Sequence, residues 1–178
     1  MVTVGEKAPD FVAPALIDGE GTAVELFKQI RTHEATVLYF YPADFVPECT
    51  AELLAVQQAG WADEDEIAVI ALSGDSLFSH AAYAAEFELT FTLVSDFHAS
   101  VAESYDLRME KWEGHIQIPL RASVVIGSDW EVRAVEPAKE PLARTTPAPI
   151  ERAGEVLRSE GLDVTQPTVD YADCPDVP

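Results

Sequence analysis

Alternation of short apolar segments with helical segments is the feature that most constrains the fold of this chain. The apolar segments are short and rich in β-branched and aromatic residues, which is typical of buried strands. They are 35–41, 67–72 and 91–96, and the helical segments between them are about 49–59 and 76–87, the second with Ser76 as its N-cap. Parallel strands need such crossover connections, so the order β-α-β-α-β predicts a parallel sheet.

The ends of the chain add other elements to this sheet. Near the N-terminus we expect a turn at 18–21 and a short helix at about 24–30. Segments 122–126 and 131–135 flank Gly127-Ser128-Asp129-Trp130 and predict an antiparallel hairpin. A final amphipathic helix is expected over about 148–159, ending before Gly161. The fold class predicted is α/β, with a central mixed β-sheet flanked by α-helices.

Length and composition favour one domain followed by a tail. The chain has 178 residues, of which 48% are hydrophobic, enough for one packed core. We expect a domain over 1–162 and an acidic C-terminal tail over 163–178, which is polar, contains proline and carries Cys174. No apolar stretch is long enough to cross a membrane, and the N-terminus has no signal-peptide pattern. The expected location is cytoplasmic, without a membrane partner.

The charge is strongly acidic. Asp and Glu number 32 against 11 Lys and Arg, which gives a formal net charge of −21. Such a chain is repelled by nucleic acid, so no nucleic-acid partner is expected. Acidic residues spread along the whole chain suit a halophilic, high-salt cytoplasm, where salt screens their mutual repulsion. An ordinary acidic protein remains the alternative, and instability at low salt would distinguish the two.

Cys49 is the chemically most informative residue of the sequence. It follows the apolar strand and a proline-containing loop, and Pro47 suits the first turn of a helix. Backbone N–H groups and the helix dipole at that position favour the thiolate, the nucleophilic form of cysteine. The alternative is a small buried side chain without chemistry. Two cysteines in a chain of this kind favour redox or catalytic use over a disulfide framework.

The residues around Cys49 resemble the active-site loop of the peroxiredoxins. The matching residues are Pro42, Asp44, Phe45, Cys49 and Glu52, and the similarity extends over roughly 4–160, including Gly5, 8–11, 73–76, 93–96 and Arg121. This resemblance implies a thioredoxin-like fold and a thiol-dependent peroxidase that reduces hydrogen peroxide or organic hydroperoxides through a Cys49 sulfenic acid. It implies no cofactor.

The resemblance also implies roles for individual residues. Cys49 would be the peroxidatic residue, Pro42 would shield it from water, and its backbone N–H together with Arg121 would hold the peroxide. Val46 stands where the family has threonine or serine, so one hydroxyl is missing. Loss of one such donor costs on the order of 10²–10³ in rate, which predicts a slowed reaction. The alternative is a non-catalytic or slow redox-sensing binding protein of the same fold.

The remaining candidates concern recycling and other chemistries. Cys174 is a possible resolving cysteine, within or between subunits, or a tail cysteine without a role. A thioredoxin-like or other thiol would be the reductant, and a homodimer or higher homo-oligomer is expected by resemblance. Glu52 would brace the loop or pair with a basic side chain. The four histidines have no metal-ligand spacing, so no metal site is expected, and none is marked as the base of a Cys-His hydrolase.

Overall fold

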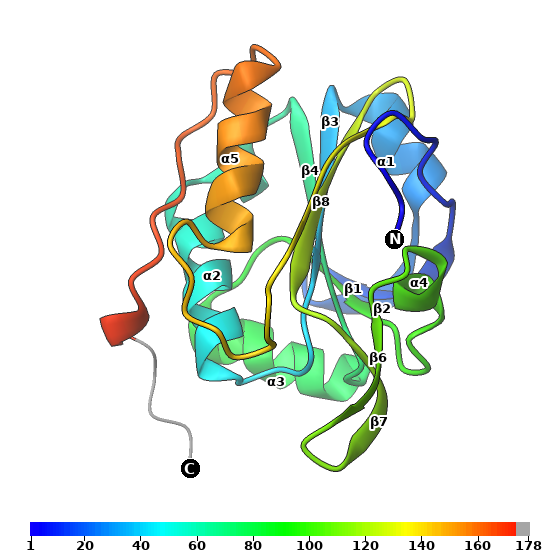
Figure 1. The fold of residues 1–178 in the computed structure, drawn as a ribbon, viewed down its shortest axis with the longest axis vertical. Helices are drawn as coiled ribbons and strands as arrows, with labels where there is room; N and C mark the ends of the chain where they lie inside the picture. The colour runs from blue at the N-terminus through cyan, green and yellow to red at the C-terminus, as the bar shows by residue number, and fades with distance from the viewer. Residues whose placement is uncertain (174–178) are drawn as a thin grey trace.

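The computed structural model describes residues 1–173 and contains one large mixed sheet (Figure 1). Its strand order is β2-β1-β5-β4-β3-β8-β9. β3, β4 and β5 run parallel, whereas β1 pairs antiparallel with β5 and β8 pairs antiparallel with β3. The strands are β1 (Val12–Ile17), β2 (Glu20–Glu25), β3 (Ala35–Phe40), β4 (Ile67–Ser73), β5 (Thr92–Ser95), β8 (Ala122–Gly127) and β9 (Val132–Pro137).

Helices cover both faces of the sheet and bury a hydrophobic core on each side. α2 (Pro47–Gln58), α3 (Leu77–Phe87) and α5 (Pro149–Ser159) pack on one face, and α1 (Leu26–Thr32) and α4 (Ser100–Ser104) on the other (Figure 1). The central strand β3 is buried along its whole length, and its side chains alternate between the two cores. Tyr39 therefore faces the α2 side, and Phe40 faces the α1 side.

Most elements predicted in the middle and late parts of the chain are confirmed. The hydroxyl of Ser76 accepts a hydrogen bond from the backbone N–H of Ser79 at 3.3 Å and caps α3. β8 and β9 form the predicted antiparallel hairpin, and α5 ends two residues before Gly161. The predicted mixed sheet with flanking helices is therefore the observed architecture.

The predicted helix at about 24–30 is wrong in its first part. β1 and β2 form a hairpin there, and Val24 is a buried residue of β2. The chain reverses at Asp18 and Gly19, both with positive φ, which suits a two-residue hairpin turn. Pairing with β5 through β1 stabilises this hairpin, and the helix α1 begins only at Leu26.

The structure also contains α4 and a second, two-stranded sheet, neither of which was predicted. The latter comprises β6 (Arg108–Trp112) and β7 (His115–Pro119), which project from the body of the molecule (Figure 1). Only the last residue of β7 is buried in these two strands, and they carry charged residues, so they lack the apolar pattern of a buried strand. No described helix is long and apolar enough to cross a membrane.

Residues 162–173 lie in an extended conformation along α5 and α2, ending in the short 3-10 helix η2 (Tyr171–Asp173) (Figure 1). The indole N–H of Trp61 donates to the carbonyl of Thr165 at 2.8 Å. Gly154 allows the close approach, since a Cβ there would lie 2.7 Å from Pro167 Cδ. The described part of the predicted tail is thus fastened to the domain, while Cys174 lies outside the described residues.

Candidate active site

The register between β3 and β8 determines where the candidate site forms. Phe40, the last residue of β3, pairs with Ala122, the first residue of β8. Because the two strands are antiparallel, the loop that leaves β3 lies beside Arg121, the residue before β8. That loop leads directly into α2, whose third residue is Cys49. Cys49 and Arg121, predicted from separate motifs, are therefore brought together.

Cys49 is completely buried, and burial dominates its protonation. Desolvation raises the pKa of the thiol well above its usual range. The Arg121 guanidinium opposes this and lowers that pKa, whereas the carboxyl groups of Glu52 and Glu48 raise it. The expectation that the helix start alone favours the thiolate is thus wrong for this closed arrangement. Here the protonated thiol is the favoured form at neutral pH.

Arg121 and Glu52 form an ion pair with no solvent exposure. Arg121 Nε lies 3.3 Å from Glu52 Oε1, and both side chains are 0% exposed. This confirms the predicted pairing of Glu52 with a basic side chain. Burial raises the pKa of Glu52 to about 7, against the lowering effects of Arg121 and of the Tyr171 hydroxyl. Tyr171 donates to Glu52 Oε1 at 3.2 Å, so the C-terminal segment reaches this pair.

Two covering segments close the site over Cys49 and Arg121. The loop between β9 and α5 places the carbonyl of Ala143 where it accepts a hydrogen bond from Arg121 Nη2. One residue further, Arg144 Nε donates to Glu48 Oε1 at 3.0 Å. Tyr171 covers the neighbouring Glu52 from the C-terminal segment. Cys49 itself is 0% exposed, so a small molecule can reach its sulfur only after neighbouring atoms move.

Two nitrogens of Arg121 remain without a hydrogen-bond acceptor among the described residues. Nε and Nη1 are buried and have no hydrogen-bond partner among the described residues, although Nε belongs to the ion pair with Glu52. Buried donors of a charged group are costly to leave unpaired. The guanidinium therefore keeps donor capacity beside Cys49 for a bound oxygen.

Val46 and Pro42 occupy the two ends of the loop before α2. Val46 is the N-cap of α2, and without a hydroxyl its side chain makes no capping hydrogen bond. Pro42 is buried and lines a small pocket of about 120 Å³ together with Gly74, Trp112 and Ile118. That pocket lies between the segment after β4 and the β6–β7 sheet, and the shielding of Cys49 by Pro42 stays a prediction.

Asp44 anchors the same loop to α3 through contacts that were not predicted from the sequence. Its carboxylate accepts hydrogen bonds from the hydroxyls of Tyr41 at 2.8 Å and Ser79 at 2.7 Å, and lies 2.9 Å from His80 Nδ1. The other ring nitrogen of His80 lies 3.0 Å from the carbonyl of Val94. Ser79 and His80 are both more than 30 residues from Asp44 in the sequence, so no local pattern predicts these contacts.

Phe45, next to Asp44, has a φ of 63°, a strained value for a non-glycine residue. Its ring packs against Tyr83 and Phe87, with centroids 4.9 Å and 6.1 Å away. These contacts offset the strain and fix the backbone just before α2. The carboxylate anchor at Asp44 and this aromatic cluster together position the first turn that carries Cys49.

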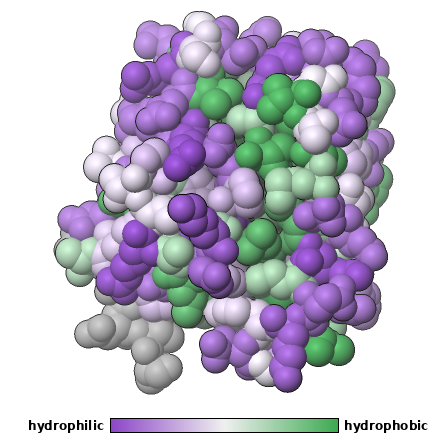
Figure 2. Space-filling model, in the orientation of Figure 1, coloured by the Kyte–Doolittle hydropathy of each residue, from purple (hydrophilic) through white to green (hydrophobic). Residues whose placement is uncertain are grey.

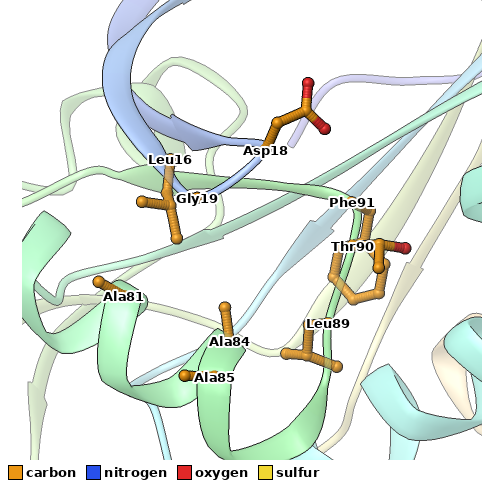
Figure 3. Close-up of a pocket in the computed structure, with 9 residues that line it drawn as sticks. All are labelled: Leu16, Asp18, Gly19, Ala81, Ala84, Ala85, Leu89, Thr90 and Phe91. Atoms are coloured by element: carbon orange, nitrogen blue, oxygen red, sulfur yellow. The ribbon is translucent and has the colours of Figure 1, made fainter.

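Other parts of the described structure carry less chemistry. Among residues 1–173 no group of three or more His, Cys, Asp or Glu side chains is arranged to hold a metal ion. A groove of about 410 Å³ lies between the β1–β2 turn and α3 (Figure 3). Small and apolar side chains line most of it, with Asp18 as its one charged group, and it contains none of the predicted site residues.

Comparison with known proteins gives consistent matches. The sequence model of the AhpC/TSA family matches residues 4–135. Alkyl hydroperoxide reductase C of Buchnera aphidicola subsp. Schizaphis graminum is 31% identical over 143 residues, which cover 75% of this chain and 70% of that protein. The reduced 2-Cys peroxiredoxin of Plasmodium vivax superposes with a TM-score of 0.70 at 27% identity, covering 88% and 93% of the two chains.

A further structural match supports the fold alone. Peroxidoxin BcpB of Mycobacterium tuberculosis has a TM-score of 0.73 at 22% identity, with 89% of this chain and 96% of that chain covered. Together with the mixed sheet and its flanking helices, these structures confirm the predicted thioredoxin-like fold class.

Proposed function

This chain belongs to the AhpC/TSA family of peroxiredoxins, which are thiol-dependent peroxidases, and from that premise we propose that Cys49 is its peroxidatic residue. The observation that carries the proposal is that Cys49 and Arg121 are both fully buried and near enough for the guanidinium charge to lower the pKa of the thiol. Two nitrogens of that guanidinium have no hydrogen-bond partner among the described residues. A cysteine and an oriented arginine are the minimum that thiolate attack on a peroxide requires.

The reaction begins when Cys49 loses its proton and the sulfur attacks the terminal oxygen of the peroxide. The S–O bond forms as the O–O bond breaks, so the sulfur is oxidised and the peroxide is reduced by two electrons. The proton released by the thiol ends on the departing oxygen, which leaves as water or an alcohol. Arg121 acts at two points, because its charge lowers the pKa of the thiol and its N–H groups hold the peroxide.

We propose that Cys174 resolves the Cys49 sulfenic acid by forming a disulfide and releasing water. Cys174 itself lies outside the described residues, but it follows Tyr171 by three positions. Tyr171 is hydrogen-bonded to Glu52, one helical turn after Cys49. Three residues span at most about 11 Å, so the position of Tyr171 favours resolution within one chain. An external thiol of the thioredoxin-like class would then reduce the disulfide.

The alternative function is a slow redox sensor of the same fold. Val46 provides no hydroxyl, and burial raises the pKa of the Cys49 thiol, and both features oppose a fast reaction. As further proposals we retain hydrogen peroxide or an organic hydroperoxide as the substrate, a cytoplasmic location and a homodimer or higher homo-oligomer. Halophilic origin is also retained as a proposal, on the strength of the net charge of −21.

A single-turnover experiment tests the proposal. Reduced protein is mixed with one equivalent of hydrogen peroxide in molar salt, and thiols are counted and intact mass is measured over time. We expect rapid loss of the Cys49 thiol followed by a link to Cys174 within one chain. Cys49→Ser should be inert, and Cys174→Ser should stop at a trappable sulfenic acid.

The outcomes separate the alternatives. A folded protein that keeps both thiols would overturn the peroxidase proposal and favour a binding role. If peroxide produces a crosslinked dimer and the same dimer also forms in Cys174→Ser, then Cys174 is not the resolving residue, and Cys49 remains the peroxidatic residue.

A further inference from the structure

The hydroxyl of Tyr39 is a buried donor without a hydrogen-bond partner. The residue is 0% exposed, and its hydroxyl is one of four buried side-chain atoms in the described part of the chain that make no hydrogen bond. Two of the other three are Nε and Nη1 of Arg121. Leaving a buried hydroxyl unpaired costs roughly 1–3 kcal/mol, so such a group in a folded protein calls for an explanation.

Comparison with the other tyrosines shows that Tyr39 is exceptional. The hydroxyl of Tyr41 bonds to Asp44, that of Tyr83 to Thr50, that of Tyr105 to the carbonyl of Pro9, and that of Tyr171 to Glu52. All five tyrosines of the sequence lie within the described residues. Tyr39 alone therefore has a hydroxyl with no hydrogen-bond partner in the structure.

Strand geometry directs this hydroxyl to the candidate site. Alternation along β3 places Tyr39 in the same core as Cys49 and Leu53, on the face covered by α2. Its ring stacks on that of Tyr41, with centroids 5.8 Å apart and an interplanar angle of 18°, which fixes the direction of the phenol.

Electrostatic effects show that the phenol lies close to the reacting groups. The Tyr39 hydroxyl makes no hydrogen bond of ordinary geometry. It nevertheless lies near enough to the Cys49 thiol and the Glu52 carboxyl to lower the pKa of each by donating toward their charged forms. Burial, Glu52 and Cys49 in turn raise the pKa of Tyr39 well above its usual value. The phenol thus keeps its proton across the working pH range and acts only as a donor.

We propose that Tyr39 is a further catalytic residue, whose hydroxyl donates a hydrogen bond to a peroxide oxygen beside the Arg121 guanidinium. The inference rests on the proposed function. Three buried donor atoms, Tyr39 Oη with Arg121 Nε and Nη1, then surround one acceptor and lose their unpaired state when it binds. Charge develops on the peroxide oxygens as the O–O bond breaks, and donors fixed in advance stabilise it. The phenol proton stays on Tyr39, so the balance of the reaction is unchanged.

The position of Val46 gives this donor additional weight. Val46, the N-cap of α2, has an aliphatic side chain at the position where the peroxiredoxin pattern has the hydroxyl of threonine or serine. Tyr39 supplies a hydroxyl from β3, in the core that also contains Cys49. The site therefore has a side-chain O–H donor although the loop before α2 provides none at its last position.

The test is the rate of thiol loss in Tyr39→Phe. Phenylalanine keeps the ring and its stacking on Tyr41 and removes only the unpaired hydroxyl, so stability should be unchanged or higher. We expect the second-order rate constant with hydrogen peroxide to fall on the order of 10²-fold. The pH profile of Cys49 alkylation should also move to higher pH, a change that a merely structural role would not produce.

Tyr105→Phe is the matched control. Tyr105 is equally buried, but its hydroxyl bonds to the carbonyl of Pro9 in the core on the other face of the sheet. The rate constant of Tyr105→Phe with hydrogen peroxide should equal that of the unmodified protein. Equal rates in Tyr39→Phe and the unmodified protein, or an equal loss in both variants, would overturn the role of Tyr39 while leaving the peroxidase intact. An inert unmodified protein would instead overturn the proposed function itself.

Discussion

At the scale of single residues, the reactivity of Cys49 is a competition between burial and charge. Desolvation and two carboxyl groups, Glu52 and Glu48, favour the thiol, and Arg121 favours the thiolate. Because Arg121 is already present, exposing the thiol to solvent or removing one of the two carboxylates would lower the pKa of Cys49. The residue at the N-cap, Val46, adds nothing polar to this competition.

Val46→Thr should raise both the peroxide rate and the stability. A threonine hydroxyl at the N-cap can accept a hydrogen bond from a first-turn N–H, which contributes about 0.5–2 kcal/mol to helix stability. Its own proton adds a donor near Cys49, so the second-order rate constant with peroxide should rise at least tenfold. Stopped-flow thiol loss and chemical unfolding measure the two effects.

Val46→Ala is the control for this substitution, because it changes the volume of the side chain without adding a hydroxyl. A rate in folded Val46→Thr that does not exceed the rate of the unmodified protein would contradict the donor argument. A rate that rises equally in Val46→Ala would attribute the effect to easier access.

At the scale of elements, Glu52 connects three segments. It lies on α2, pairs with Arg121 at the start of β8, and accepts a hydrogen bond from Tyr171 in the C-terminal segment. Its carboxyl also faces the backbone N–H of Ile150 at the start of α5, at 3.4 Å. One side chain thus holds together the elements that cover Cys49, and its protonation affects all of them.

The pKa of Glu52 predicts a stability that falls with rising pH. Burial raises this pKa in the folded state from 4.5 to about 7, so the folded state binds the proton more tightly than the unfolded state. The resulting stabilisation is complete below about pH 4.5 and lost as the pH approaches 7. Its size is on the order of 3 kcal/mol, from about 1.4 kcal/mol per pKa unit.

Urea unfolding at fixed ionic strength between pH 4.5 and 8 tests this prediction. In Glu52→Gln the fall in unfolding free energy over that range should be smaller than in the unmodified protein. Glu155→Gln, at an exposed position of α5, should keep the full dependence. Identical curves for Glu52→Gln and the unmodified protein would show that the Glu52 carboxyl has no raised pKa.

At the scale of the whole molecule, acidic charge dominates the surface. The net charge is −21, and hydrophilic residues cover much of the face shown in Figure 2, interrupted by an apolar band to the right of its middle. Several ion pairs, such as Lys28 with Glu25, are exposed and contribute little stability. Repulsion among unpaired carboxylates therefore opposes folding at low salt.

We expect the melting temperature to rise steeply between about 0.02 and 0.3 M KCl, the range in which the Debye length shrinks from tens of ångströms to a few. Differential scanning calorimetry at pH 7.5 measures it. A variant with three exposed acids replaced by lysine, Asp65→Lys, Glu86→Lys and Glu155→Lys, should need less salt for the same melting temperature. A melting temperature that ignores KCl, or identical salt curves for both proteins, would exclude charge repulsion and remove the support for a halophilic origin.

Local pattern by itself determined much of this protein. Short stretches of sequence predicted the buried strands β3, β4 and β8, the Ser76 cap and the position of Cys49 near the start of a helix. They could do so because strand alternation, capping and turn preferences act over a few residues. Weakly apolar elements such as β6 and β7 were missed for the same reason, since their pattern is weak.

Tertiary structure decided what surrounds Cys49. Glu52 contacts Arg121, 69 positions away, and Tyr171, 119 positions away. The sequence predicted a basic partner for Glu52 without specifying it, and it did not suggest Tyr171. The sequence placed Tyr39 in a strand, and only the packing of α2 on that strand showed its hydroxyl to be unpaired beside the thiol. Burial also reversed the expected protonation of Cys49, because the pKa of a thiol depends on the solvent and charges excluded or gathered by the whole fold.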